Sequence, residues 1–192
     1  MKNIAVGIAF MLIYQCSSKD NFQTISCIDD YHINLDSLAG VVYIGCGEAI
    51  VNGDKTEILP LLLHNAHKNT YTFVGHSCQN GRIALTIVAE FEIKGTIDKV
   101  FYTKEFIRGF CAVRKEGDYL KEKIYDKIQN CNISYKVSKQ SIVDINMDLT
   151  FMNKKDSTVI KVENVVAHTR TTSKEELRKI EFYSRYYYRY GI

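Results

Sequence analysis

The sequence of 192 residues lacks several features that mark common classes of protein. It has no tryptophan and a single proline, and it contains no proline-rich linker, low-complexity tract or internal repeat. Its six cysteines do not reach the density of a small disulfide-stapled scaffold. Beyond residue 18, no segment approaches the roughly twenty apolar residues that a membrane-spanning helix needs. The hydrophobic content of 46% excludes an intrinsically disordered chain.

The chain also lacks a broad excess of either charge. It has 25 Lys and Arg residues against 22 Asp and Glu residues, which gives a formal net charge of +3. Six of the basic residues and three of the acidic ones fall within residues 170–192, so the positive excess is confined to the C-terminal segment. A balanced body does not provide the basic face that nucleic-acid binding requires, and we expect no nucleic-acid partner.

The N-terminus has the pattern of an export segment. Lys2 precedes an uncharged and mostly apolar run over residues 4–14, whose length suits the core of a signal peptide. The run ends in the sequence IYQCSSKD at residues 13–20, with Cys16 directly after the apolar core. This segment resembles the export signal of bacterial lipoproteins, in particular those of Bacteroidetes-like bacteria.

The resemblance implies that Cys16 becomes an acylated N-terminus, whose lipid anchors the protein in a membrane of the cell envelope, at the outer membrane or cell surface. The chain is then divided into a signal peptide at residues 1–18, a polar tether at residues 19–37 and a single globular domain at residues 38–192. Two alternatives stay open. Ordinary cleavage after Ser18 would release a secreted protein, and an uncleaved segment would itself serve as the anchor.

Alternating patterns predict β-strands over much of the domain. Residues 82–93 alternate between an apolar face and a face that becomes increasingly polar. Residues 143–151 show the same alternation, and residues 158–168 return after a polar turn. Pro60 within residues 56–63 favours an edge strand or a broken helix there. Short polar turns, two of which are Asn-Gly pairs, favour antiparallel pairing.

Two segments are predicted to be helical. Asp118 is a candidate N-cap for a helix over residues 118–130. The apolar residues of this segment recur at intervals of four and are Leu120, Ile124 and Ile128. Ser173 and Glu176 have capping-box spacing and open a C-terminal helix. The sequence therefore predicts an α+β fold, with a curved, mainly antiparallel β-sheet (a meander or a partly closed barrel) and two helices.

Five cysteines remain once Cys16 has been acylated or removed, and an exported domain permits disulfides. The disulfide candidates are Cys27, Cys46, Cys78, Cys111 and Cys131. An odd number cannot pair completely, so at least one thiol is free or pairs with another chain. The sequence does not choose among the pairings, and buried free thiols that pack like small apolar side chains are the alternative.

Four residues offer ligands to a transition metal. On a helical turn His64 and His67 would share a face, and on a strand His76 and Cys78 would share a face. The two pairs together could complete a tetrahedral zinc site. Their spacing matches no specific zinc motif, and a solvated loop with Cys78 in the core or in a disulfide is the alternative. We therefore expect no cofactor, with zinc as one alternative.

Calcium is the other alternative cofactor. The polar face of one predicted strand carries Asp144, Asn146 and Asp148. With Glu163 on the hairpin partner, these groups could hold calcium or act in acid–base catalysis. The chain has no calcium-loop spacing with its turn glycine. A polar face exposed to water explains these residues equally well, and Glu90 and Glu92 have the same interpretation.

The C-terminal segment combines aromatic and basic side chains. Its candidate interaction residues are Tyr183, Arg185, Tyr186, Tyr187, Arg189 and Tyr190. Protein interfaces favour tyrosine and arginine, and tyrosine rings also suit a lipid headgroup layer. We expect a protein partner at this segment, with docking of its apolar stripe on the sheet as the alternative.

No motif in the chain specifies a catalytic site. A cysteine nucleophile would need a lowered thiol pKa and an adjacent base, and no local pattern singles one out. The sequence therefore predicts a lipid-anchored, non-enzymatic binding or interaction module of the cell envelope. The alternatives are a freely secreted, disulfide-bonded effector or ligand carrier and a small extracytoplasmic metal-dependent enzyme.

Overall fold

Ten β-strands make up the described part of the chain. The computed structural model describes residues 46–79, 82–94, 97–105, 107–115, 118–138 and 142–173. The strands are β1 (Cys46–Val51), β2 (Asp54–Asn65), β3 (Thr70–Gln79), β4 (Arg82–Glu92), β5 (Val100–Thr103), β6 (Arg108–Lys115), β7 (Asp118–Tyr125), β8 (Lys127–Val137), β9 (Ile142–Met152) and β10 (Val159–Ser173). These residues contain no helix, so this part of the protein is all-β.

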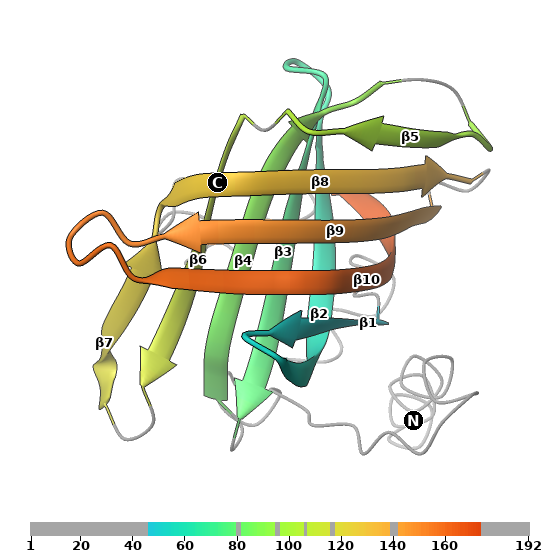
Figure 1. Ribbon diagram of the computed structural model, residues 1–192. Helices are drawn as coiled ribbons and strands as arrows, with labels where there is room; N and C mark the ends of the chain where they lie inside the picture. Colours follow the sequence, from blue (N-terminus) through green and yellow to red (C-terminus); the bar gives the residue numbers. More distant parts are fainter. Residues whose placement is uncertain are drawn as a thin grey trace, which may run out of the picture.

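The strands form one sheet that folds over on itself into two layers (Figure 1). The order across the sheet is β5-β8-β9-β10-β1-β2-β3-β4-β6-β7, and neighbours in this order pair antiparallel. We call β5, β8, β9, β10 and β1 the first layer, and β2, β3, β4, β6 and β7 the second layer. In Figure 1 the strands β8, β9 and β10 run across the steeper strands β3 and β4 behind them.

β2 carries the chain from one layer to the other. Its first part, up to Ile58, pairs with β1, and its second part pairs with β3. Pro60 lies just beyond this change of partner, within a continuous strand, so neither the edge strand nor the broken helix expected there is observed. The Pro60 carbonyl accepts a hydrogen bond from Thr169 Oγ1 at 3.3 Å. Residues 171–173 of β10 pair in parallel with residues 62–64 of β2, which joins the layers at this corner.

The core lies between the two layers. Every second residue of β9 from Val143 to Phe151 is at most 2% exposed, whereas the residues between them are exposed or half-buried. The second layer contributes Phe73, Ile87 and Phe91, which are fully buried. Burial of a side chain of this size contributes about 1.5–3 kcal/mol. The alternating pattern thus determines which face of each strand meets the other layer.

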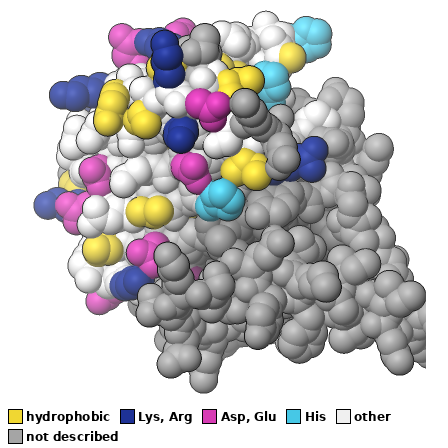
Figure 2. All heavy atoms as spheres, turned by 90° about the vertical axis from the view of Figure 1, so that its right-hand side faces the viewer, with side chains coloured by type: hydrophobic (Ala, Val, Ile, Leu, Met, Phe, Trp, Pro, Cys, Tyr) yellow, Lys and Arg dark blue, Asp and Glu magenta, His cyan; other side chains and the backbone are white. Residues whose placement is uncertain are grey.

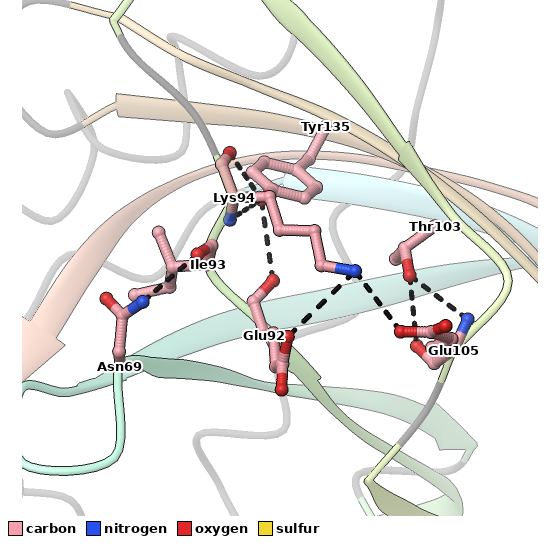
Figure 3. Close-up of polar contacts among 7 residues, drawn as sticks. All are labelled: Asn69, Glu92, Ile93, Lys94, Thr103, Glu105 and Tyr135. Carbon is pink, nitrogen blue, oxygen red and sulfur yellow. Dashed lines mark hydrogen bonds and ion pairs between the residues drawn. The ribbon is translucent and has the colours of Figure 1, made fainter.

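Tyr135 of β8 links the two layers at one end of the molecule (Figure 3). Its hydroxyl accepts a hydrogen bond from the Lys94 backbone N–H at 2.6 Å and donates one to the Lys94 carbonyl at 2.9 Å. Desolvation raises the pKa of Tyr135, so the hydroxyl keeps the proton that it donates. Lys94 Nζ lies 3.2 Å from Glu105 Oε2 and 3.9 Å from Glu92 Oε2, which connects the segment after β4 to the segment after β5.

The predicted α+β class is wrong for the described residues. Residues 118–130, predicted as a helix, form β7 and the beginning of β8, with a break at Asp126. An interval of four positions fits one face of a strand as well as one face of a helix, because four is a multiple of two. A helical stripe also needs apolar residues at intervals of three, and those positions are occupied by Lys123 and Lys127.

The second predicted helix falls almost entirely outside the described residues. Its expected first residue, Ser173, is the last residue of β10 and pairs with His64 of β2, so it is part of a strand. The signal peptide and the tether, residues 1–37, also lie outside the described residues. The described part of the predicted domain therefore begins at Cys46.

Candidate functional site

The outer face of the first layer is open to solvent, and we call it the polar face. Its central members are Ser134, Lys136, Asp144, Asn146, Val166 and His168, which are all exposed or half-buried. They belong to β8, β9 and β10 and point outward because alternate residues of the same strands fill the core.

The strand register arranges the polar face in rows. One row consists of Tyr102 on β5, Ser134, Asn146 and Val166, and the next consists of Lys136, Asp144 and His168. Neighbours within such a row have Cβ atoms about 4.5–5.5 Å apart, so one extended ligand can contact several of them. Tyr102 is 76% exposed and offers a bare aromatic ring at the end of its row.

A histidine–aspartate pair occupies the second row. His168 Nδ1 lies 2.6 Å from Asp144 Oδ1, and the two side chains are 49% and 54% exposed. The register also places the backbone of Cys46 opposite His168. Both side chains of this pair are therefore open to solvent.

The polar face does not carry charge of one sign. Figure 2, which looks at the right-hand end of Figure 1 rather than directly at the polar face, shows acidic and basic side chains interspersed over the described atoms. Within the rows, Lys136 is the neighbour of Asp144. At the edge of the face, Glu48 Oε2 on β1 lies 2.8 Å from Lys55 Nζ on β2. A surface of mixed charge does not attract a highly charged ligand over long distances.

The structure separates the histidines of the predicted zinc site. His64 lies opposite Tyr71 and His76 lies opposite Leu59, so the two histidines are five register positions apart, or about 17 Å. They also lie on opposite faces of the second layer, because a separation of five positions along a strand is odd. His67 lies in the exposed turn between β2 and β3.

The remaining predicted ligand, Cys78, has its backbone in β3 and its side chain outside the description. Over the described residues, no group of three or more His, Cys, Asp and Glu side chains could hold a metal ion. The zinc prediction therefore gains no support from the structure.

His76 instead belongs to the interior of the molecule. It is 3% exposed, and its Nδ1 lies 3.2 Å from Thr86 Oγ1 on the neighbouring strand. Burial and, to a smaller extent, the charge of Arg114 lower the pKa of His76 to about 4. The imidazole is therefore neutral at physiological pH and has a structural role.

The acidic residues of the predicted calcium site do not converge either. Asp144 and Asp148 lie on the same face of β9 but four residues apart, which is about 14 Å along a strand. Glu163 pairs with Ile50 of β1, on the far side of β10 from β9. Asp148 Oδ1 accepts a hydrogen bond from the backbone N–H of Asn164 at 2.8 Å, so it stabilises an irregularity of the neighbouring strand.

Two of the disulfide candidates are free thiols in the core. Cys111 of β6 and Cys131 of β8 are buried and unpaired. Burial raises the pKa of Cys111 to about 12 and that of Cys131 to about 11, so neither forms a thiolate at neutral pH. The backbones of Cys46 and Cys78 are in strands, and their side chains are not described.

The predicted anchor and the predicted partner surface lie outside the described residues. They comprise Cys16 with the disulfide candidate Cys27 at the N-terminus, and Tyr183, Arg185, Tyr186, Tyr187, Arg189 and Tyr190 at the C-terminus. The structure therefore leaves both predictions as they stand.

The sequence reasoning missed the pairing of Asp144 with His168, because β10 contains a β-bulge. The register of β10 against β9 shifts by one residue between Val162 and Val165, and Asn164 has a φ of 49° there. Without the bulge, His168 would face the core. The sequence does carry an indication: the apolar residues Ile160 and Val162 are followed by Val165 and Ala167, which breaks the interval of two.

Searches of protein-family models, of curated proteins and of solved structures each returned no match to this chain. Within the described ranges, no helix has the length and hydropathy needed to cross a membrane.

Proposed function

We propose that this protein is a non-enzymatic binding module of the cell envelope, anchored by a lipid at Cys16 and binding through the polar face. The observation that supports binding is the row Tyr102, Ser134, Asn146 and Val166, which offers an aromatic ring, a hydroxyl and an amide on one solvent-exposed line. The observation that supports the anchor is the cysteine directly after an apolar core.

The chemistry of the polar face favours a glycan over a protein as the ligand. Protein interfaces have an apolar centre, whereas Val166 at the centre of this face is flanked by Asn146 and Glu48. Two other exposed apolar residues of this face, Val100 and Tyr102, lie on the edge strand β5. Amides, hydroxyls and carboxylates supply the donors and acceptors that sugar hydroxyls require. An exposed tyrosine offers an apolar ring with a polar tip, which matches the two kinds of surface on a sugar. The mixed charge favours a ligand of low net charge.

Binding is tested by sedimentation of the purified full-length protein with insoluble peptidoglycan, and with cellulose as a glycan from outside the bacterial envelope. We expect peptidoglycan to sediment the protein, and Tyr102→Ala and Asn146→Ala each to weaken binding at least about 5-fold, since each removes a contact of about 1 kcal/mol. The matched control is Lys127→Ala, an exposed residue at the opposite end of β8 from this row. Equal sedimentation of all four proteins would rule out the polar face as the glycan site.

The anchor is tested separately by mass spectrometry of the mature N-terminus after expression in a bacterium that processes lipoproteins. We expect an acylated peptide that begins at Cys16 and remains with the membrane fraction, and a Cys16→Ser variant that does not acquire acyl mass. An unmodified peptide that begins at Lys19 would instead identify a secreted protein. This outcome would remove the anchor from the proposal without affecting the binding face.

A further inference from the structure

The outer face of the second layer differs from an ordinary solvent-facing sheet because it is buried. Its central row consists of Leu61, Val74, Val88 and Phe110 on four successive strands. Leu61, Val74 and Val88 are 1%, 4% and 2% exposed, and Phe110 is half-buried. We call this row, with the rows on either side of it, the covered face.

The flanking rows of the covered face are polar and equally buried. One contains Thr72 and Glu90, and the other contains His76 and Thr86, and all four residues are between 1% and 5% exposed. Glu90 is paired with Arg108 and accepts a hydrogen bond from Thr70 Oγ1 at 3.2 Å. Burial of a carboxylate and an imidazole on one face requires that water is excluded from it by other parts of the chain or by a ligand.

The described residues do not provide that cover. The core and the first layer lie against the opposite face of these strands, where Phe73, Ile87 and Phe91 point. The extensive contacts of β2, β3, β4 and β6 within the described ranges are with their neighbours in the sheet and, for β6, with β8 of the first layer. The cover must therefore come from elsewhere.

We propose that the C-terminal segment, residues 174–192, folds back on the covered face and excludes water from it. The segment starts at the right place, because β10 ends at Ser173, beside His64 of β2. The preceding residue, Thr172, lies opposite Leu63, and both are at most 3% exposed. The chain therefore leaves the described residues at the β2 edge of the covered face.

The length of the segment is sufficient for the cover. From β2 to β6 the covered face spans three interstrand spacings, or about 14 Å. The nineteen residues after Ser173 reach about 60 Å when fully extended, so even a compact backbone crosses the face.

The composition of the segment matches the chemistry of the face. Nine of its nineteen residues are Leu, Ile, Phe or Tyr, which suits the apolar central row. Tyrosine also brings a hydroxyl that can meet the buried threonines and Glu90 of the flanking rows. The tether at residues 19–37 is less suited, because it has six such residues and carries four Asp against one Lys. In this arrangement Tyr183 and its neighbours contact the second layer rather than a partner protein.

Photo-crosslinking in the full-length protein tests the proposal directly. The variant Phe110→p-benzoylphenylalanine places a photoreactive ring in the central row, and Tyr102→p-benzoylphenylalanine places the same ring on the exposed polar face as the matched control. After irradiation and digestion, we expect mass spectrometry to find intramolecular links from position 110 to peptides within residues 174–192, and none above background from position 102. Links from position 110 to residues 19–45 or to a second copy of the chain, or no difference between the probes, would overturn the proposal.

Limited trypsin digestion gives a second readout, because the segment contains Arg178, Lys179, Arg185 and Arg189. We expect Val88→Lys to expel the segment and to speed cleavage at these sites at least about 10-fold, since cleavage follows the population of the open form. Val166→Lys, on the polar face, should leave the rate unchanged. Equal and fast cleavage in the wild-type protein and both variants would show that the segment is already free. Should Val88→Lys fail to fold, the crosslinking result decides.

Discussion

The two outer faces of this folded-over sheet differ in their access to water more than in their polarity. Val88 on the covered face is 2% exposed, whereas Val166 on the polar face is 47% exposed. Both faces carry acidic, histidine and hydroxyl side chains. On the covered face these groups meet each other, as in the contacts of His76 with Thr86 and of Glu90 with Thr70. His168 and Asp144 are also in contact on the polar face, so neither the polar residue type nor its polar partner reveals which side of a sheet faces solvent.

A single acidic substitution on each face should show the largest difference. We expect Val88→Asp to lower the free energy of unfolding by at least about 3 kcal/mol, because it buries a carboxylate at a position that holds an apolar side chain. The same change at Val166 should lower it by no more than about 0.5 kcal/mol. Urea denaturation followed by circular dichroism measures both values.

A milder pair of substitutions tests the same difference if Val88→Asp does not fold. We expect Val88→Ala to cost about 2 kcal/mol and Val166→Ala to cost almost nothing. Losses of equal size at the two positions would contradict the distinction between the faces.

Acid should destabilise the protein through His76, which is buried on the covered face. The pKa of His76 is about 4 in the folded protein and 6.5 for an unperturbed histidine, so the unfolded chain takes up a proton first as the pH falls. The contribution of His76 to the free energy of unfolding is therefore fully present above pH 6.5. It is lost progressively toward pH 4, by about 3 kcal/mol in total. Denaturation midpoints between pH 7 and pH 4 measure the loss, which His76→Asn should abolish.

The matched control for this pH dependence is His67→Asn, because His67 is exposed in the turn between β2 and β3. We expect this variant to lose stability with acid as the wild-type protein does. An unchanged slope in His76→Asn would mean that other groups cause the acid sensitivity.

The two faces also differ in how well the sequence alone predicts them. The apolar face of residues 82–93 and the alternation of residues 143–151 correspond to β4 and β9, because a period of two follows directly from strand geometry. The other face of β4 becomes increasingly polar in the sequence, and exposure to water is one of two explanations that the sequence allows for Glu90 and Glu92. Thr86, Val88 and Glu90 are instead buried, because burial there depends on which distant segment covers the strand.

Other features of the structure could not be predicted from the sequence, for different physical reasons. The bulge at Asn164 changes which residues of β10 face solvent, and a single residue of register decides the position of His168. The helix predicted over residues 118–130 failed because intervals of four suit both kinds of element. The zinc hypothesis combined the pair His64 and His67 with the pair His76 and Cys78, and the ladder between β2 and β3 places His64 far from His76.

Ion pairs on the more buried surface should contribute more to the free energy of unfolding than ion pairs on the exposed surface. Arg114 Nε lies 2.8 Å from Glu122 Oε1 on the second layer, and the two side chains are 17% and 6% exposed. We expect a double-mutant cycle on this pair to give a coupling energy of about 1–3 kcal/mol. The matched pair, Lys154 with Asp126, is 61% and 43% exposed and should give no more than about 0.5 kcal/mol. Equal coupling in the two cycles would imply that water reaches Arg114 and Glu122.

The smallest effect is expected at the His168–Asp144 pair of the polar face. Its contact is short, at 2.6 Å, but both side chains are about half exposed, so water and salt screen their attraction. We expect His168→Asn to change the free energy of unfolding by no more than about 0.5 kcal/mol at pH 7, as measured by urea denaturation. If the variant nevertheless lost peptidoglycan binding, the pair would serve recognition and not the fold. A loss above about 2 kcal/mol would instead mean that this surface is covered, because only exclusion of water makes such a pair costly to break.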